Sequence, residues 1–523
     1  MEMEMKKKFA IAYNTEEQFD RIKSYYNIYK EYKEFNLILV KDTNLSEITK
    51  VLDIDSSNND DGKEGDDRLN EEARGGRGVV GEGGEGEKGK RRKMKVATLT
   101  KYTIAYERAG DFNLHIDFSS SSNNNAYVPA ALTYIDVHRL SNFSYAVDEI
   151  TKQTTMPPCG DSNVIFIFDT GLNITHEAFA KDFMMHLSDN FTNFKAQGLV
   201  ERYSVVGDDG SDDFKTHGHG TPVTFLARMS APNADIFSIK VIRKVQTESG
   251  GIAWQATDEE ILDGLRLAFQ ILENRKRRHS MGVPYLVELY NMSFGGEPSP
   301  TPTPVELAIE NISKSRPQAV FLAAAGNLGP GKGTIVTPAQ SPWCIAIGSC
   351  ESSFFASSYS SRGPARNNLI KPEYLFFGTD IVAASRQSDT AYASFTGTSF
   401  ATPLITGALA TTVSGAIFVT PQVQQFIRQI QDYALDIRSI INYIGTKITV
   451  KPRFASDANL SGKDNTYGWG IPMGDRVAQQ MNFLIQTMEQ QTASSQLSQL
   501  STILQQLLML GMLSAAFTRL APH

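Results

Sequence analysis

Three polar residues of different chemical character stand at positions where a folded chain could bring them together. Asp169 follows the apolar run VIFIF, His219 lies between two glycines, and Ser399 precedes an apolar run that favours a helix. An imidazole can take the proton of a serine hydroxyl while a carboxylate orients the imidazole. The three residue types therefore indicate nucleophilic catalysis by a serine.

Asp169 begins a DTG triplet at the end of its predicted strand. Taken alone the triplet is weak evidence, since an aspartate there is more often a turn residue or a helix cap. DTG also occurs in aspartic proteases, which pair two such carboxylates. No second DTG or DSG follows an apolar strand in this chain, which disfavours that alternative.

His219 lies in THGHGTPVTFLARM, where an apolar run predicts a helix directly after it. His217 competes for the role of general base, and the His-x-His spacing would also suit a pair of metal ligands. A zinc site needs further ligands, and the sequence around these histidines supplies none. A general base is the favoured interpretation of His219.

Ser399 lies in SFTGTSFATPLITGALA, a turn of small residues that runs into a predicted helix. Its hydroxyl and backbone N–H would then lie at a helix amino terminus, where partial positive charge favours a developing oxyanion. A serine at such a place is usually only a cap. The glycine, threonine and proline around Ser399 make a nucleophile the more specific interpretation.

Four segments in chain order resemble the signatures of the subtilase family of serine proteases. They are DTG at Asp169, HGT at His219, AAAGN ending at Asn327 and GTSFATP around Ser399. The order Asp, His, Ser is the one found in subtilisin. Supporting segments are NMSFGG, TPAQSPWCIAIGS, YSSRGP, KPEYLFFGTDI and YGWGIPMGDRVA, so the resemblance covers about residues 150–480.

The resemblance implies a role for each matched residue. Ser399 would be the nucleophile, His219 the general base and then acid, and Asp169 the group that orients the imidazole. Asn327 would donate its amide to the oxyanion together with the N–H of Ser399. The expected activity is that of a serine endopeptidase acting on peptides or proteins.

The same resemblance implies two walls of a substrate cleft. Ser293, Phe294 and Gly295 would form one wall and bind a peptide as an added strand, although Phe294 could equally be core. Ala324, Ala325 and Gly326 would lie opposite. Leu328 follows the oxyanion asparagine where an acidic residue often stands, which favours an uncharged, apolar residue on the acyl side of the scissile bond.

Two positions depart from the family pattern, and neither is a triad position. Pro222 replaces the histidine that commonly follows HGT, and Glu373 stands in KPE where the family usually has KPD. Many subtilases bind structural calcium, but no compact Asp-rich loop at ligand spacing identifies ligands here. No cofactor is required for the expected chemistry.

Short apolar strands alternate with helical patterns from Asn163 onwards, as in VIFIFD, ADIFSIKVI, YLVELYNMS, AVFLAAAG and CIAIGSC. Fully apolar strands separated by helices predict a mostly parallel sheet covered on both faces. The resemblance makes this α/β architecture a subtilisin-like three-layer sandwich. Catalytic residues are expected at the carboxyl ends of its strands.

The chain divides into five predicted regions. Residues 1–52 form a small α+β module with a helix over EEQFDRIKSYYNIYKEY and a strand at Leu37–Val40. Residues 53–95 are a charged, Gly-rich linker. Residues 96–140 are β-rich and could continue the module, 141–480 form the catalytic domain, and 481–523 a helical tail. The module resembles the inhibitory prodomain of subtilases, and an accessory domain is an equally good interpretation. If it is a prodomain, the chain could be cleaved at GKRRKMK or in the SSSSNNN loop.

Composition excludes several function classes. The 523 residues carry a formal net charge of −7, with 41% apolar residues, which is typical of a globular protein and not of a nucleic-acid binder. Cys344 and Cys350 end one predicted strand about 20 Å apart, too far for a disulfide. The amino terminus lacks a signal-peptide pattern, so a cytoplasmic location is expected, and a membrane is not expected as a partner.

Two other functions compete with the protease prediction. A subtilase fold retained as a binding module would lack an intact triad, which this chain has in sequence. An esterase of the α/β-hydrolase type would place its serine in GxSxG and order its triad Ser, Asp, His. Ser399 has Ala401 at the last motif position, and the order differs.

Overall fold

The structure is a computed structural model of the whole chain. It describes residues 7–43, 48, 94–104, 108–111, 163–181, 183–185, 194–278, 285, 287–419, 449–452, 462–474 and 476. The predicted linker up to residue 93, the alternating strand predicted at 112–118, Cys159, the SSSSNNN loop and the tail at 481–523 lie outside these residues.

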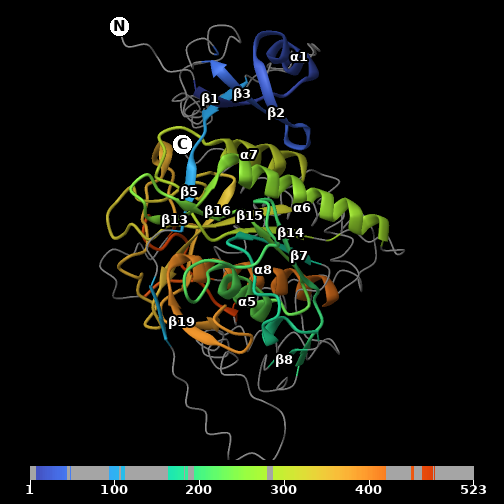
Figure 1. Cartoon of the computed structure of the whole chain (residues 1–523). Coiled ribbons are helices and arrows are strands. Elements are labelled where there is room, and N and C mark those ends of the chain that lie inside the picture. Colours follow the sequence, from blue (N-terminus) through green and yellow to red (C-terminus); the bar gives the residue numbers. More distant parts are fainter. Residues whose placement is uncertain are drawn as a thin grey trace, which may run out of the picture.

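A seven-stranded parallel sheet forms the centre of the molecule (Figure 1). Its strand order is β10-β11-β7-β14-β15-β16-β17, and every neighbouring pair is parallel. The strands are β7 (Asn163–Asp169), β10 (Val200–Ser204), β11 (Asp235–Lys240), β14 (Val287–Met292), β15 (Ala319–Ala324), β16 (Cys344–Cys350) and β17 (Tyr374–Phe377). The predicted subtilisin-like α/β sheet is therefore confirmed.

Two pairs of helices cover the two faces of this sheet (Figure 1). On one face, α6 (Asp258–Arg278) and α7 (Pro304–Ser315) pack over Phe166 and Phe168. On the other, α5 (Gly220–Ser230) and α8 (Thr398–Val419) pack over Ile165 and Ile167. Because successive strand residues face opposite ways, a continuous apolar run such as VIFIF supplies both cores.

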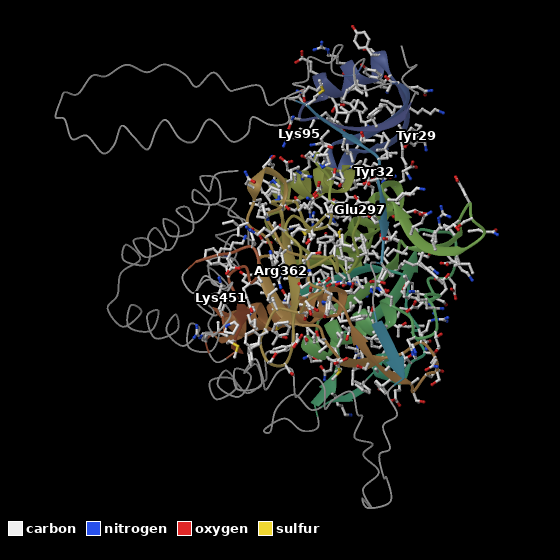
Figure 2. All side chains as sticks on the ribbon, turned by 90° about the vertical axis from the view of Figure 1, so that its left-hand side faces the viewer. Tyr29, Tyr32, Lys95, Glu297, Arg362 and Lys451 are labelled. Atoms are coloured by element: carbon white, nitrogen blue, oxygen red, sulfur yellow. The ribbon has the colours of Figure 1, made fainter. Side chains whose placement is uncertain are left out.

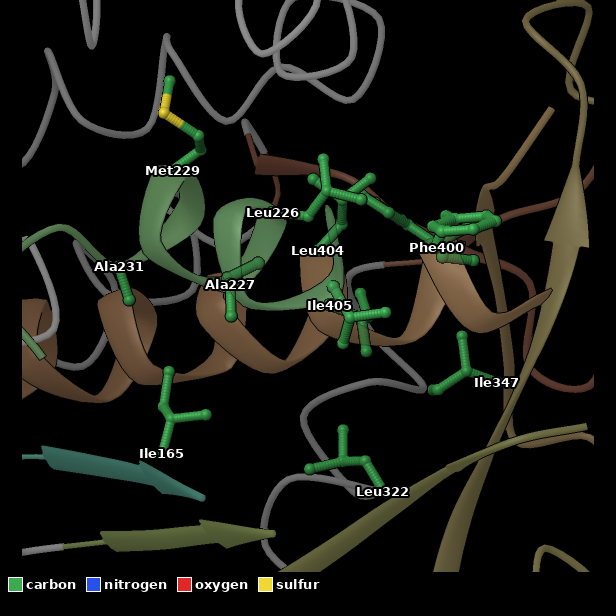
Figure 3. Close-up of a cluster of buried hydrophobic side chains, with 14 of the residues drawn as sticks. Ile165, Leu226, Ala227, Met229, Ala231, Leu322, Ile347, Phe400, Leu404 and Ile405 are labelled. Atoms are coloured by element: carbon green, nitrogen blue, oxygen red, sulfur yellow. The ribbon is translucent and has the colours of Figure 1, made fainter. Parts of the chain in front are cut away.

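Helices α5 and α8 lie directly against each other (Figure 3). Leu226 and Ala227 of α5 and Leu404 and Ile405 of α8 belong to one buried cluster. A Cβ atom added at Gly407 would lie 2.4 Å from Cβ of Ser230, so the helices approach as closely as their backbones allow. The relative position of the two helix amino termini is fixed by this packing.

An amino-terminal module (residues 7–43 and 94–98) packs on α6 and α7 (Figure 1). Its antiparallel sheet has the order β2-β3-β1-β4. Its elements are β1 (Lys7–Ala12), α1 (Glu16–Tyr25), β2 (Asn27–Tyr32), the 3-10 helix η1 (Lys33–Phe35), β3 (Leu37–Thr43) and β4 (Lys95–Thr98).

The helix predicted over residues 16–32 is too long. Helix α1 ends at Tyr25, Tyr26 is extended with φ −125° and ψ 151°, and β2 follows and pairs with β3. The hydroxyls of Tyr29 and Tyr32 reach Glu259 and Asp263 of α6. These contacts and the pairing to β3 override a tyrosine spacing that also suits a helix.

Smaller sheets surround the main one. Their strands are β5 (Lys101–Thr103), β6 (Arg108–Asp111), β8 (Phe183–Met185), β9 (Phe194–Ala196), β12 (Arg243–Gln246), β13 (Ile252–Thr257), β18 (Ile381–Ala384), β19 (Tyr392–Thr396), β20 (Thr449–Val450) and β21 (Ile471–Pro472). The sheets are β12-β13-β5, β18-β19-β6, β8-β9 and β20-β21. Two further 3-10 helices are η3 (Glu177–Phe179) and η4 (Arg366–Asn368).

The two described cysteines are buried free thiols at opposite ends of β16. This agrees with the absence of a disulfide between Cys344 and Cys350 that their spacing predicts. None of the helices within the described ranges combines the length and the apolarity that crossing a membrane requires.

Candidate active site

Asp169 and His219 form a buried pair at the carboxyl end of the central sheet. Asp169 is the last residue of β7, and its Oδ1 lies 2.6 Å from Nδ1 of His219, with both side chains fully buried. The backbone N–H of Thr170 donates to the same carboxylate oxygen at 2.7 Å. A carboxylate on Nδ1 holds the imidazole with Nε2 facing away from it, which is the orientation a general base needs.

The glycines of the two motifs let their backbones touch. A Cβ atom at Gly220 would lie 2.1 Å from the carbonyl oxygen of Gly171, and one at Gly171, whose φ is +108°, would lie 2.4 Å from that of Gly210. Across this contact the N–H of Gly220 donates to Oγ1 of Thr170 at 2.9 Å. Larger residues here would push His219 away from Asp169.

Asp212 is a site residue that the sequence did not single out. It is buried, and its Oδ2 accepts hydrogen bonds from the N–H groups of His219 at 3.0 Å and Thr221 at 2.9 Å. Its Oδ1 accepts from the N–H of Phe214 and the hydroxyl of Thr170. Burial raises the pKa of the Asp212 carboxyl despite these donors. Asp212 thereby fixes the backbone that carries the histidine.

Little in the sequence indicates this role of Asp212. Asp212 lies in the acidic run DDGSDD, which is typical of an exposed loop. Its distance from His219 is only seven residues. A carboxylate so close to a histidine flanked by glycines is the one clue that could have found it.

Ser399 is the second residue of α8 and is almost fully buried. The hydroxyl of Ser293 donates to its carbonyl oxygen at 2.8 Å, and Nδ2 of Asn291 donates to Oγ of Ser293 at 2.9 Å. N–H groups in the first turn of a helix have no partner within the helix and carry partial positive charge. The N–H of Ser399 is one of these groups.

Helix α5, which follows His219, packs against helix α8, which carries Ser399. Helix α5 begins directly after His219, and the imidazole lies against Phe400, with 5.6 Å between ring centroids. The ring of Phe214 contacts the imidazole from another side at 5.6 Å. Aromatic rings around the histidine exclude water and strengthen its interaction with Asp169.

Asn327 lies at the carboxyl end of β15, next to the start of α8. Its Oδ1 accepts from both the N–H and the hydroxyl of Thr398, each at 2.9 Å. The neighbouring N–H of Gly326 lies 3.3 Å from the same hydroxyl oxygen. These contacts fix the amide plane of Asn327 beside the residue that precedes Ser399.

The first predicted cleft wall is in contact with the amino-terminal part of the chain. Phe294 is buried and packs edge-on against Tyr102, with 5.9 Å between ring centroids. The N–H of Thr103 donates to the carbonyl of Gly295 at 2.9 Å, and the N–H of Gly295 donates back at 3.1 Å. Gly295 thus forms an isolated antiparallel bridge with Thr103, an extended part of the protein's own chain.

The second predicted wall is a continuation of β15. Ala324 and Ala325 are buried, and the N–H of Ala325 donates to the carbonyl of Ile347 at 2.8 Å. Gly326 has φ +109°, which a residue with a side chain rarely adopts. Leu328 is 44% exposed, so it lies at the surface and not inside the wall.

His217 contacts the loop that follows β18. Its Nδ1 lies 3.4 Å from Oγ of Ser385, and its carbonyl accepts from the N–H of Arg386 at 2.9 Å. Within the described ranges, no group of three or more His, Cys, Asp and Glu side chains forms a candidate metal site.

Pro222 and Glu373, the two residues that depart from the family pattern, are both buried. Pro222 lies in the first turn of α5, where a missing N–H costs nothing. Glu373 is buried between Lys371 and Lys463, at 2.8 Å from each, and also accepts from the N–H of Ala346. Although burial opposes it, these two cations lower the pKa of the Glu373 carboxyl.

The family assignment agrees with this geometry. The model of the subtilase family matches residues 160–470. The chain belongs to the subtilase family. It is 24% identical over 267 residues to serine protease AprX of Bacillus subtilis, and this alignment covers 44% of this chain and 57% of AprX. It is 26% identical over 315 residues to alkaline protease 1 of Aspergillus flavus, covering 58% and 66%.

The subtilase thus spans less than two thirds of the length of both relatives. A solved structure of the prenylagaramide maturation protease PagA aligns with 64% of this chain and 98% of its own, at 16% identity and a TM-score of 0.41. The family model shows the family, and the parallel central sheet of this chain shows the fold.

Proposed function

We propose that this subtilase is a serine endopeptidase, with Ser399 as nucleophile, His219 as general base and Asp169 as its orienting carboxylate. The buried contact of 2.6 Å between Nδ1 of His219 and Oδ1 of Asp169, beside the helix that carries Ser399, is the main support. Membership in a family whose named relatives are proteases supports the same activity.

In the proposed reaction, Oγ of Ser399 attacks the carbonyl carbon of a peptide bond while Nε2 of His219 takes the hydroxyl proton. The carbonyl electrons move to its oxygen, which accepts from the amide of Asn327 and the N–H of Ser399. The C–N bond breaks as His219 passes the proton to the leaving amine. Water then attacks the carbonyl carbon of the ester and gives a proton to His219. The bond to Oγ of Ser399 breaks as His219 passes this proton to Oγ, which releases the acid and restores the serine hydroxyl.

We also propose that the amino-terminal part of the chain is an intramolecular inhibitory segment. The segment of residues 99–104, here the β5 segment, pairs with β13 on one side and with Gly295 on the other. A substrate bound as an added strand at Gly295 would need the same N–H and carbonyl groups. The β5 segment and a substrate therefore exclude each other.

Strand β6, which follows the β5 segment in the chain, contacts the strand that leads into α8. Strand β6 pairs with β19, and its Arg108 lies opposite Thr396, two residues before Thr398. Thr103 therefore contacts the cleft wall at Gly295, and Arg108 contacts the strand that leads to Ser399.

The module anchors the β5 segment on the helices behind the cleft (Figure 2). The hydroxyl of Tyr29 donates to Glu259 at 2.8 Å, and Lys95 lies 2.9 Å from Glu310 of α7. Asn311 donates to the carbonyl of Phe35 at 2.9 Å. These polar contacts add to the buried aromatic packing of Phe35 against Phe269.

The test uses the full chain and Ser399→Ala. Each is incubated with a fluorophosphonate, before and after limited trypsin treatment, and with an unfolded protein substrate. The proposal expects labelling and cleavage by the parent chain and neither by Ser399→Ala. If folded parent chain stays unlabelled after trimming, the protein is a subtilase fold without peptidase activity.

A further inference from the structure

The side chain of Val336 lies between the two walls of the proposed cleft. A Cβ atom built on Gly295 would lie 2.2 Å from Cγ2 of Val336, and one built on Gly326 would lie 2.6 Å from its Cγ1. One valine therefore touches the backbone of both walls. It is buried, with 4% of its surface exposed.

The backbone around Val336 is tied to each wall. The N–H of Val336 donates to the carbonyl of Ala325 at 3.0 Å. On the other side, Thr337 and Gly296 exchange two hydrogen bonds, at 2.9 and 3.3 Å. Val336 cannot move out of the gap without breaking these bonds, so the gap has a fixed depth.

The strand register places this gap beside Ser399. Thr103 pairs antiparallel with Gly295, so the residue two positions further along a bound chain would lie opposite Ser293. The hydroxyl of Ser293 contacts the carbonyl of Ser399.

We infer that the enzyme cleaves after small residues, Gly, Ala or Ser, because Val336 occupies the space that a larger side chain would need between Gly295 and Gly326. The residue on the acyl side of the cleaved bond is called P1. The inference rests on the proposed peptidase function and narrows the apolar P1 preference expected from Leu328. Because Leu328 lies at the surface, Val336 and not Leu328 limits the depth of the gap.

The test is a set of peptides that differ only at P1, which is Ala, Ser, Leu, Phe or Lys. Each is assayed for kcat/KM with the parent chain, Val336→Ala and Val336→Gly. One methylene in a pocket changes selectivity by roughly 10- to 200-fold. We expect the parent chain to prefer Ala over Phe by at least about 100-fold, and Val336→Gly to raise kcat/KM for Phe by about tenfold or more.

Ile335→Val is the matched control, since it removes one methylene from the buried neighbour of Val336. It should leave the order of P1 preference unchanged. If Val336→Gly fails to fold, as judged by its thermal transition, Val336→Ala replaces it in the comparison. We expect Val336→Ala to raise kcat/KM for the Leu peptide by a smaller factor.

A fluorophosphonate, which carries no P1 side chain, separates the two possible failures. A labelled enzyme that cleaves after Phe or Leu as well as after Ala overturns the P1 inference and leaves the peptidase function intact. A folded enzyme that stays unlabelled even after limited trypsin treatment overturns both.

Discussion

Oδ1 of Asn327 accepts two hydrogen bonds from Thr398, one from its N–H and one from its hydroxyl, both at 2.9 Å. Because the amide oxygen is held in this way, the NH2 group of Asn327, which lies across Cγ from that oxygen, is turned away from the N–H and the hydroxyl of Thr398. The residue before the proposed nucleophile thus orients the proposed oxyanion donor.

Thr398→Val removes the hydroxyl and keeps the shape of the side chain. We expect kcat to fall roughly tenfold with little change in KM, since leaving a buried polar group without its hydrogen-bond partner costs about 1–3 kcal/mol. Thr398→Ser restores the hydroxyl and should restore kcat. Steady-state kinetics on one peptide checks this, and equal kcat for Val and Ser at position 398 would contradict it.

Asp212→Asn tests the carboxylate beneath the histidine backbone. The amide offers one acceptor oxygen, so either the N–H groups of His219 and Thr221 or the donors on Phe214 and Thr170 lose their acceptor and face an NH2 group instead. We expect the fluorophosphonate labelling rate to fall by about tenfold or more. Asp213→Asn is the matched control because that carboxylate faces Lys240 and solvent instead. A similar loss in both variants would argue for general destabilisation.

Thr103→Pro tests the β5 segment as an inhibitor. Proline removes the N–H that donates to Gly295, whereas Thr103→Ala keeps it. We expect Thr103→Pro to be labelled by fluorophosphonate several-fold faster than Thr103→Ala and the parent chain. Tyr25→Ala, on an exposed residue of α1, controls for changes in the module that leave the cleft contact alone. Equal rates in all four proteins would exclude inhibition by this segment.

The buried carboxyl of Asp258 contacts the β5 segment at Thr100 and Tyr102. Its carboxylate accepts from the N–H groups of Thr100 and Val305 and from the hydroxyl of Tyr102, and it faces the buried Glu306. Burial raises the pKa of Asp258 to about 7. A carboxyl with a raised pKa stabilises the folded state at low pH, and this stabilisation is lost as the pH rises from about 4 to about 7.

Asp258→Asn should therefore flatten the pH dependence of stability. Between pH 5 and 7 the parent chain should lose up to roughly 1.4 kcal/mol per pH unit relative to the variant. Thermal denaturation midpoints over pH 5–8 measure this difference, because other groups titrate alike in both proteins. A difference that stays constant with pH would show that Asp258 does not titrate in this range.

Local sequence patterns were sufficient for the central sheet, since runs such as VIFIF and CIAIGSC are too apolar for any place but a core between two helical layers. The ends of β7 and β15 and the start of α8 also followed from the motifs at Asp169, Asn327 and Ser399. These elements depend on residues close in the chain. Their positions in space then follow from the parallel sheet, which gathers strand ends on one edge.

Contacts between distant segments could not be predicted in this way. Strand β2 forms because its tyrosines reach α6, more than 200 positions away in the chain. Val336 fills the cleft only because its segment bonds to both walls, and nothing in TIVTPAQ indicates that. The role of Asp212 depends on a loop that returns to its own histidine. Each case needs the tertiary arrangement and not the local pattern.

The place of β5 between β13 and Gly295 also matters for solubility. Without β5, the N–H and carbonyl groups of β13 and Gly295 would form an open sheet edge beside the buried aromatic ring of Phe294. An open edge next to apolar surface pairs with any extended chain, including another copy of the same protein. A β5 segment made with the rest of the chain would therefore protect the newly folded molecule from self-association as well as from its own activity.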